Sequence, residues 1–170
     1  VWAEIDRIDA PVFIHPTTPF VDSFGLGEYG LANTIGFTTD TTTCFAKFLL
    51  SGFFDRYPRV RPIACHGGGS LPFLMGRFDR MWEISASRRD ISQPPSTHLR
   101  RIFFDSIVYD QRTLEYLVAT VGADRVLYGS DYPFRLGDMA GLLGRVNALA
   151  PAERDAVRGL NAIREFKLKV

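Results

Sequence analysis

The chain has 170 residues, of which 20 are Lys or Arg and 19 are Asp or Glu, so its formal charge is +1. A charge this close to zero gives no electrostatic basis for binding nucleic acid or an anionic membrane. Hydrophobic residues make up 46% and charged residues 23%, the proportions of a folded domain rather than a disordered chain. The longest apolar stretches fall well short of the roughly 20 residues that a membrane span needs. We therefore expect one domain over residues 1–170, with neither nucleic acid nor a membrane as a partner.

The first ten residues, Val1–Ala10, resemble the end of a helix that lacks a start signal, and the chain begins with Val instead of Met. We interpret this start as a sign that the sequence belongs to something longer. Cys44 and Cys65 each lie within an apolar segment. Buried free thiols are typical of a reducing compartment, so we expect a cytoplasmic location.

Four short apolar runs, rich in β-branched or aromatic residues, predict strands. None of them alternates cleanly between apolar and polar residues, so each strand should be covered on both faces, as in a parallel sheet. In chain order they are Val12–His15, Pro62–His66, Ile102–Asp105 and Arg125–Gly129.

Helical stretches separate and follow these runs. They are Thr41–Tyr57, Leu71–Arg88, Gln111–Val121 and Pro151–Phe166. The alternation predicts an α/β fold of about four β-α units. A complete eight-stranded barrel usually needs about 250 residues, so units of this length predict half a barrel.

Polar residues stand where the expected strands end, which is the edge of an α/β sheet where chemistry collects. His15 closes the first strand, where its imidazole can either bind a metal or be held by a backbone carbonyl. His66 begins the run His-Gly-Gly-Gly, whose glycines allow a sharp bend and a close approach to a ligand, and it is a candidate general base. The same run occurs in the oxyanion hole of α/β-hydrolases, but the GxSxG sequence that such enzymes need is absent.

Asp131 lies in the sequence Gly-Ser-Asp-Tyr-Pro, where it can bind a metal or a water molecule or have only a structural role. Pro133 should keep the chain extended beyond it. Asp105 ends the third strand and can either position a catalytic group or cap the next turn, with the cap favoured. Among the aromatic residues, Phe20, Tyr29 and Tyr132 lie in loops that can shape a pocket. The loop Thr17–Thr39 should decide between decarboxylase and hydrolase chemistry.

In this order, the motifs resemble those of the amidohydrolase-related group that includes aminocarboxymuconate-semialdehyde decarboxylase and hydroxybenzoate decarboxylases. The likeness covers nearly the whole chain but only the C-terminal half of the metal-dependent hydrolase-type (β/α)8 TIM barrel of that group. The matching segments are His15-Pro16, Thr38–Thr43, Ser51-Gly52, Tyr57-Pro58, His66–Pro72, Gly129–Pro133 and Asn161-Ala162.

The resemblance implies a divalent metal, usually Zn²⁺, held by His15 and Asp131. It implies that His66 acts as an acid or base beside the metal and that Asp131 also contacts metal-bound water. Arg77 matches an arginine that reaches across a dimer interface to bind a substrate carboxylate, although on the residues alone it can equally be a surface arginine on its helix. The implied enzyme is a carboxy-lyase (decarboxylase) or a hydrolase of a small, aromatic or conjugated carboxylate.

The chain departs from this group in one respect, because the His-x-His pair of the group's first strand is absent. The histidines are His15, His66 and His98, and we expect His98 to lie at the surface. Catalytic zinc sites take at least three protein ligands, so either a missing N-terminal segment or another chain completes the site, or the metal is not bound. The alternative is a truncated, inactive half-barrel that survives as an oligomer or an interaction module.

Overall fold

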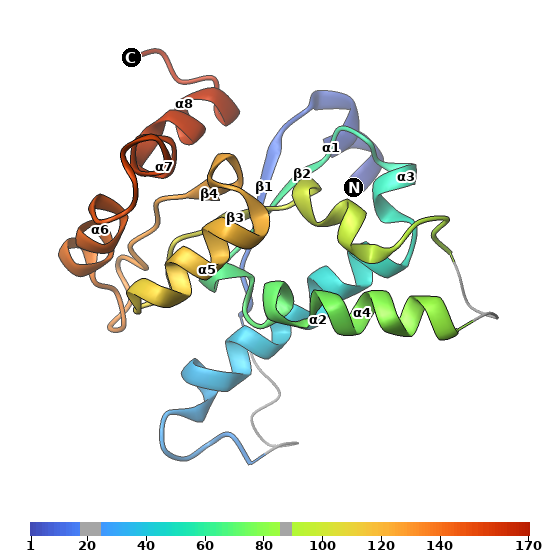
Figure 1. Ribbon diagram of the computed structural model, residues 1–170, viewed down its shortest axis with the longest axis horizontal. Helices are drawn as coiled ribbons and strands as arrows, with labels where there is room; N and C mark the ends of the chain where they lie inside the picture. Colours follow the sequence, from blue (N-terminus) through green and yellow to red (C-terminus); the bar gives the residue numbers. More distant parts are fainter. Residues whose placement is uncertain (18–24, 86–89) are drawn as a thin grey trace.

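The computed structural model of the protein describes residues 1–17, 25–85 and 90–170, and the fold is a four-stranded parallel sheet with helices packed around it (Figure 1). The strand order in space follows the chain, and all neighbouring strands are parallel. The strands are β1 (Pro11–Ile14), β2 (Arg61–Ala64), β3 (Phe103–Asp105) and β4 (Val126–Leu127). All four predicted strands are therefore present, and the expected α/β fold, half of a barrel with parallel strands, is confirmed. The strands β1, β2 and β4 end before His15, His66 and Asp131, and β3 ends at Asp105.

The helices lie between and after the strands. They are α1 (Trp2–Ile8), α2 (Phe37–Leu50), α3 (Phe53–Arg56), α4 (Leu71–Ile84), α5 (Gln111–Val121), α6 (Met139–Asn147), α7 (Pro151–Asp155) and α8 (Asn161–Glu165). Shorter 3₁₀ segments span His66–Gly68, Pro95–Arg101 and Ala123–Arg125, and π-helical turns span Ala32–Gly36 and Ala156–Leu160. None of the helices described here is long and apolar enough to cross a bilayer.

The bounds of α5 agree with the prediction, because Asp110 caps its start by accepting the N–H of Thr113 at 3.0 Å. The predicted helix Thr41–Tyr57 is wrong in two ways: it begins four residues earlier, at Phe37, and it breaks at Gly52, whose φ of +66° is left-handed. The helix α6 was not expected, because two glycines weaken its helical signal. Residues 86–88 of the predicted helix Leu71–Arg88 lie outside the described residues.

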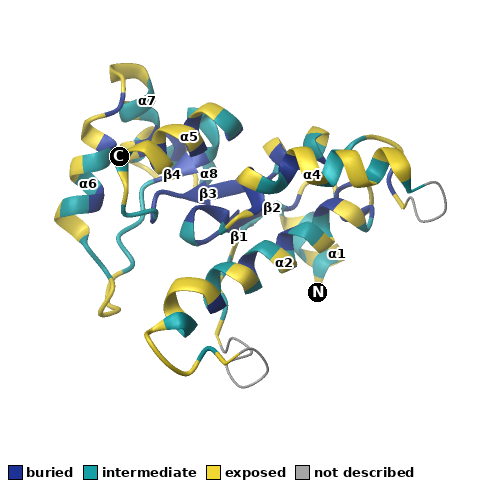
Figure 2. Cartoon of the chain, turned by 60° about the horizontal axis from the view of Figure 1, so that its bottom comes forward, coloured by how far each residue is buried: buried dark blue, intermediate teal, exposed yellow. Residues whose placement is uncertain are grey.

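Two hydrophobic clusters occupy opposite faces of the sheet, because successive residues of a strand point to opposite sides. Phe104 belongs to the larger cluster, with Phe45 of α2 and Leu114 of α5. Phe103 belongs to the smaller one, which packs against Ala162 of α8. Buried residues are concentrated in β2 and β3 (Figure 2). Phe13 has Ile63 as its partner in the sheet register but remains 53% exposed, so the expectation that both faces of every strand are covered is wrong for β1.

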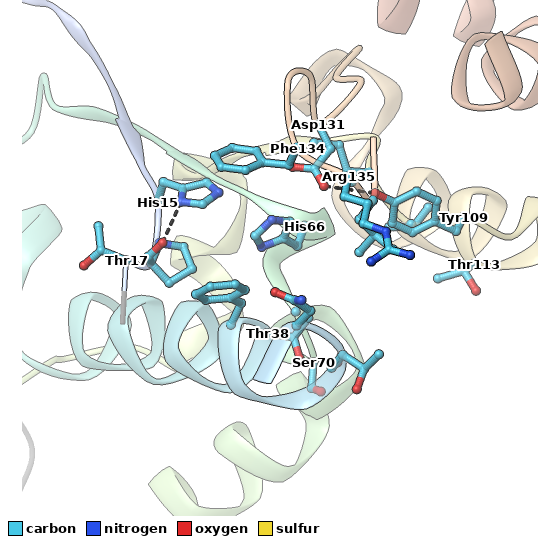
Figure 3. Close-up of a pocket in the computed structure, with 18 residues that line it drawn as sticks. His15, Thr17, Thr38, His66, Ser70, Tyr109, Thr113, Asp131, Phe134 and Arg135 are labelled. Carbon is cyan, nitrogen blue, oxygen red and sulfur yellow. Dashed lines mark hydrogen bonds between the residues drawn. The ribbon is translucent and has the colours of Figure 1, made fainter. Parts of the chain in front are cut away.

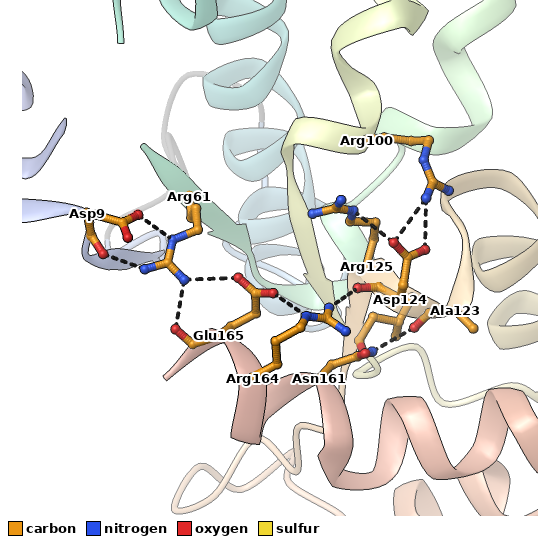
Figure 4. Close-up of polar contacts among 10 residues, drawn as sticks. Asp9, Arg61, Arg100, Ala123, Asp124, Arg125, Asn161, Arg164 and Glu165 are labelled. Carbon is orange, nitrogen blue, oxygen red and sulfur yellow. Dashed lines mark hydrogen bonds and ion pairs between the residues drawn. The ribbon is translucent and has the colours of Figure 1, made fainter. Parts of the chain in front are cut away.

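Polar contacts attach α8 to the sheet where β2 and β4 begin (Figure 4). The buried amide of Asn161 donates to the carbonyls of Ala123 and Val126, at 2.7 and 2.8 Å. Arg61, on β2, donates to the carboxylate of Glu165 at 3.0 Å and forms a second ion pair with Asp9 at 3.1 Å. These contacts join the last helix to β2 and β4.

Candidate metal and substrate site

The segments that follow the carboxyl ends of the four strands surround one open cavity of about 1010 Å³ (Figure 3). His15 follows β1, His66 follows β2, Tyr109 follows β3, and Asp131 follows β4. The start of α2 and the π-helical turn before it complete the wall. The structure thus brings the three polar residues that the sequence singled out as metal or acid–base groups into a single cavity.

His15 is held in one tautomer by the residue that follows it. Its Nδ1 lies 2.6 Å from the carbonyl oxygen of Pro16. A carbonyl oxygen can only accept, so Nδ1 carries the proton, and Nε2 of the neutral ring keeps its lone pair. Metal-binding histidines are oriented by the same kind of bond to the second ring nitrogen. The two alternatives considered for His15 are therefore compatible, since the carbonyl contact leaves Nε2 available as a ligand.

The ring of His66 lies beside that of His15, with ring centroids 5.1 Å apart and the planes at 70°. Its Nδ1 is buried and has no hydrogen-bond partner among the residues that the structure describes. Burial lowers the pKa of His66, and the neighbouring His15 lowers it further, while the charge of Asp131 has the opposite effect. His66 is therefore a neutral imidazole near pH 7, able to accept a proton.

The backbone of His66 is fixed by Asp105, which lies fully buried beneath it. The Asp105 carboxylate accepts the N–H groups of His66 at 2.9 Å, Gly67 at 2.8 Å and Ile107 at 3.1 Å. Burial raises the pKa of this carboxyl to about 6, although the three N–H groups oppose the rise. Asp105 thus caps the next turn through the N–H of Ile107, as favoured, and it also holds the preceding turn that carries His66, which is the positioning role considered as the alternative.

The three glycines after His66 have left-handed backbones, and each lies against another part of the protein. A Cβ on Gly67 would overlap Val108, and one on Gly69 would overlap the carbonyl oxygen of Thr38. A Cβ on Gly68 would lie 2.6 Å from the Phe104 ring. The glycines therefore let this turn pack closely against side chains and backbone of the same chain, and Gly69 also lines the cavity.

Asp131 also has a left-handed backbone, with φ of +59°, and accepts a hydrogen bond from the hydroxyl of Tyr109 at 3.1 Å. Burial raises the pKa of Tyr109, and the charge of Asp131 raises it further, so the phenol remains a donor. The expectation of an extended chain after Asp131 is wrong. The Tyr132–Pro133 peptide is cis, and the N–H of Phe134 returns to the carbonyl of Asp131 at 2.9 Å.

Aromatic rings flank both histidines. Phe134 stacks on His15 with centroids 5.8 Å apart and planes at 11°, and Phe37 stacks on His66 at 6.4 Å. The expected pocket aromatics were different. Tyr29 and Tyr132 are 89% and 76% exposed and do not line the cavity, and Phe20 lies outside the described residues.

Cys65 contributes a third potential donor atom near the two histidines. Its Sγ and a ring nitrogen of each of His15 and His66 lie within 4.8 Å of one another, and Asp131 joins no such group of three within the described residues. The thiol is buried and donates to the carbonyl of Ile14 at 2.9 Å, and burial raises its pKa to about 12. Cys65 is therefore a protonated, internally bonded thiol rather than a ready thiolate ligand. Cys44, expected to be buried, is only half-buried.

Arg77 lies exposed on α4 and is not among the residues that line the cavity of its own chain. His98, expected at the surface, is half-buried and stacks on Phe54 at 5.9 Å. Tyr109, Phe134, Arg135 and Phe37 are among the cavity residues that the sequence did not indicate. The one available signal was the position of Phe134 and Arg135 directly after the Gly-Ser-Asp-Tyr-Pro motif.

A sequential parallel sheet with two histidines and an aspartate at its strand ends defines a β/α metal-dependent hydrolase-type architecture. A sequence model of the amidohydrolase family matches residues 1–168, so the chain belongs to the amidohydrolase family. The resemblance inferred from the motifs is thereby confirmed.

Several characterised relatives are decarboxylases. The chain is 28% identical to 2-amino-3-carboxymuconate-6-semialdehyde decarboxylase of Dictyostelium discoideum, over 96% of this chain and 46% of the relative. It is 29% identical to gamma-resorcylate decarboxylase of Rhizobium sp. strain MTP-10005, over 98% of this chain and 53% of the relative. The chain thus spans about half the length of these relatives.

Solved structures agree with this fold. The 5-carboxyvanillate decarboxylase LigW of Sphingomonas paucimobilis superposes with a TM-score of 0.88 at 26% identity, over 99% of this chain and 52% of that one. The dihydroxybenzoic acid decarboxylase of Polaromonas sp. JS666, whose structure holds manganese, gives a TM-score of 0.85 over 98% of this chain and 52% of that one. At 23% identity that likeness extends to the fold alone. Zinc in this chain stays a prediction.

Proposed function

We propose that this chain forms the C-terminal half of the active site of a metal-dependent decarboxylase that acts on a small aromatic or conjugated carboxylate. The observation that carries the proposal is the convergence of His15, His66 and Asp131 in one cavity flanked by the rings of Phe37 and Phe134. The names of the relatives favour decarboxylation over hydrolysis.

The donor set fits a divalent cation. His15 offers Nε2, because Nδ1 is held by Pro16, and Asp131 offers a carboxylate oriented by Tyr109. Together they supply one nitrogen and one carboxylate donor, which suit zinc, manganese and related ions. A catalytic zinc site takes three protein ligands, so a further ligand from another segment or another copy completes the proposed set. When bound, such a cation polarises substrate oxygen atoms and lowers the pKa of coordinated water.

His66 handles the proton in the proposed reaction. Decarboxylation breaks the bond between the ring carbon and the carboxylate, carbon dioxide leaves, and the electron pair stays on the carbon until a proton arrives. His66 would take this proton from solvent and pass it to the ring carbon, which its lowered pKa favours, while the N–H bond that it donates to Asp105 holds its backbone in place. The aromatic rings beside both histidines suit the flat face of an aromatic substrate.

Arg77 retains its proposed role only if a second copy of the chain is present, because it does not line its own cavity. The homo-oligomer is thus part of the proposal. The competing possibility, an inactive half-barrel or interaction module, is supported by the exposed Phe13 on the edge strand β1.

The test is the metal content of the purified chain by elemental analysis, combined with release of carbon dioxide from 2,6-dihydroxybenzoate. We expect bound metal in the wild-type chain, loss of the metal in His15→Ala, and retained metal with lost turnover in His66→Ala. His98→Ala is the matched control, since His98 stacks on Phe54 outside the cavity. Unchanged metal in His15→Ala or full turnover in His66→Ala would refute the assigned role. A wild-type chain without metal or turnover would favour the inactive half-barrel.

A further inference from the structure

The turn after Asp131 places a permanent positive charge in the cavity. Arg135 lines it, and among the described lining residues it is the one Lys or Arg side chain. Figure 3 shows its guanidinium projecting into the cavity beside Tyr109, on the side of His66 away from His15. The cavity therefore has a cationic group at one side and the two histidines at its centre and other side.

This guanidinium has no partner within the part of the chain that the structure describes. Arg135 is exposed and makes no hydrogen bond or ion pair there, Asp131 included. Arginines at the opposite end of the sheet are paired: Arg61 with Asp9 and Glu165, and Arg100 with Asp124 through two bonds (Figure 4). Arg135 thus offers a planar set of N–H donors to whatever occupies the cavity.

The backbone that carries Arg135 is held by the protein. The N–H of Gly137 donates to the carbonyl of Phe134 at 2.9 Å, and the N–H of Asp138 donates to the carbonyl of Ser130 at 3.1 Å. The turn also packs tightly at Gly137, because a Cβ there would lie only 2.7 Å from the carbonyl oxygen of Asp131. The guanidinium therefore extends from an anchored turn, adjacent to the Phe134 ring that stacks on His15.

We propose that Arg135 is the residue that recognises the substrate's carboxylate from within the same chain, and this rests on the proposed function. A guanidinium binds a carboxylate through two parallel N–H···O bonds, and few other side chains provide that geometry. An aromatic carboxylate can place its ring against the phenyl groups of the cavity and its charge at Arg135. The site then selects anionic aromatic ligands without requiring Arg77 of another copy.

The test is an NMR titration of the metal-free, chelator-treated chain with benzoate and with benzamide, which has the same shape but no charge. Charged hydrogen bonds of this kind contribute about 1.5–3 kcal/mol, so we expect Arg135→Gln to weaken benzoate binding about tenfold or more and to leave benzamide binding unchanged. Arg135→Lys keeps the charge but loses the planar set of N–H donors, so its affinity for benzoate should lie between those of the wild type and Arg135→Gln. Arg158→Gln removes an exposed arginine that does not line the cavity and should bind as the wild type does.

Three results would overturn the proposal. They are a wild-type chain that binds no benzoate, a wild-type chain that binds benzoate no tighter than benzamide, and an Arg135→Gln chain with unaltered benzoate affinity. Because the titration contains no metal and no turnover, its outcome is separate from that of the decarboxylase proposal. Benzoate selectivity that depends on Arg135, without metal-dependent turnover, would leave the recognition role standing and remove the decarboxylase. Metal-dependent turnover that Arg135→Gln does not change would leave the decarboxylase proposal standing and remove the recognition role of Arg135.

Discussion

The carboxylate of Asp105 accepts the backbone N–H of His66 at 2.9 Å, across 39 positions of sequence. The same carboxylate binds the N–H of Gly67 and of Ile107, so it joins the turn after β2 to the segment after β3. Both of its oxygens are engaged, and the side chain is fully buried. The proposed acid–base residue is therefore held through its main chain, which leaves its ring free for chemistry.

Asp105→Asn should destabilise the chain because an amide nitrogen replaces one accepting oxygen. At least one of the three N–H groups would then face a donor, at a cost of about 1–3 kcal/mol. Chemical denaturation with circular dichroism measures this loss. Asp110→Asn is the control, since Asp110 is exposed and both bonds that it accepts from Thr113 go to one oxygen, Oδ1, which the amide can retain. Equal stability of the wild-type and Asp105→Asn chains would contradict the structural role.

The stability that Asp105 provides should depend on pH. Burial raises its pKa from 3.8 to about 6, so the folded chain holds this proton more tightly than the unfolded chain. The contribution to the free energy of unfolding is then complete below about pH 4 and is lost as the pH rises through about 6. We expect the difference in this free energy between wild type and Asp105→Asn to grow as the pH falls from about 7 to about 4. His66, whose pKa is lowered, acts in the opposite direction in both chains and largely cancels. A difference that does not vary with pH would show that Asp105 has an ordinary pKa.

Gly69→Ala should be strongly destabilising. The backbone there has φ of +61°, and the new Cβ would overlap the carbonyl oxygen of Thr38. Strain and overlap together should cost more than about 2 kcal/mol. Gly144→Ala is the matched control, because that glycine lies within α6 with nothing within 4 Å of the added atom. The free energy of unfolding of Gly144→Ala should be unchanged, or higher by up to about 1 kcal/mol because alanine has the greater helix propensity. Thermal unfolding of both variants measures the contrast, and similar melting temperatures would argue against the turn geometry described here.

Tyr109→Phe tests the proposed role of Asp131 as a ligand. The variant loses the hydroxyl that donates to Asp131 at 3.1 Å, and loss of such a supporting bond typically reduces metal affinity by about tenfold or more. Competition with a chelator measures this affinity. Tyr116→Phe removes a comparable bond, to the carbonyl of Pro72 at 3.2 Å, outside the main cavity and should retain full affinity. Equal metal affinities in the two variants would show that Asp131 is not a metal ligand.

The sequence was sufficient to predict the four strands and to place His15, His66 and Asp131 at one edge of the sheet, because apolar runs and polar strand ends are local patterns. It did not indicate that Asp105 binds the turn of His66, since that contact joins two separate β-α units. Phe37 was missed as a cavity residue because the helix was expected to begin later. Arg135 was missed because the turn after β4 has no periodic pattern, and its position depends on backbone bonds such as that from Phe134 to Asp131.

Because the strands lie in the sheet in chain order, each polar cavity group comes from a different segment of the sequence. His15, His66, Tyr109 and Asp131 each follow a different strand, and Arg135 lies on the turn after the last one. Loops on a fixed sheet can vary in sequence without disturbing the sheet itself. If Arg135 has the proposed role, residues after Asp131 can be exchanged to alter ligand preference while His15 and His66 stay in place. In this chain the residue proposed to recognise the carboxylate and the groups proposed to bind metal and move the proton lie on different segments of the polypeptide.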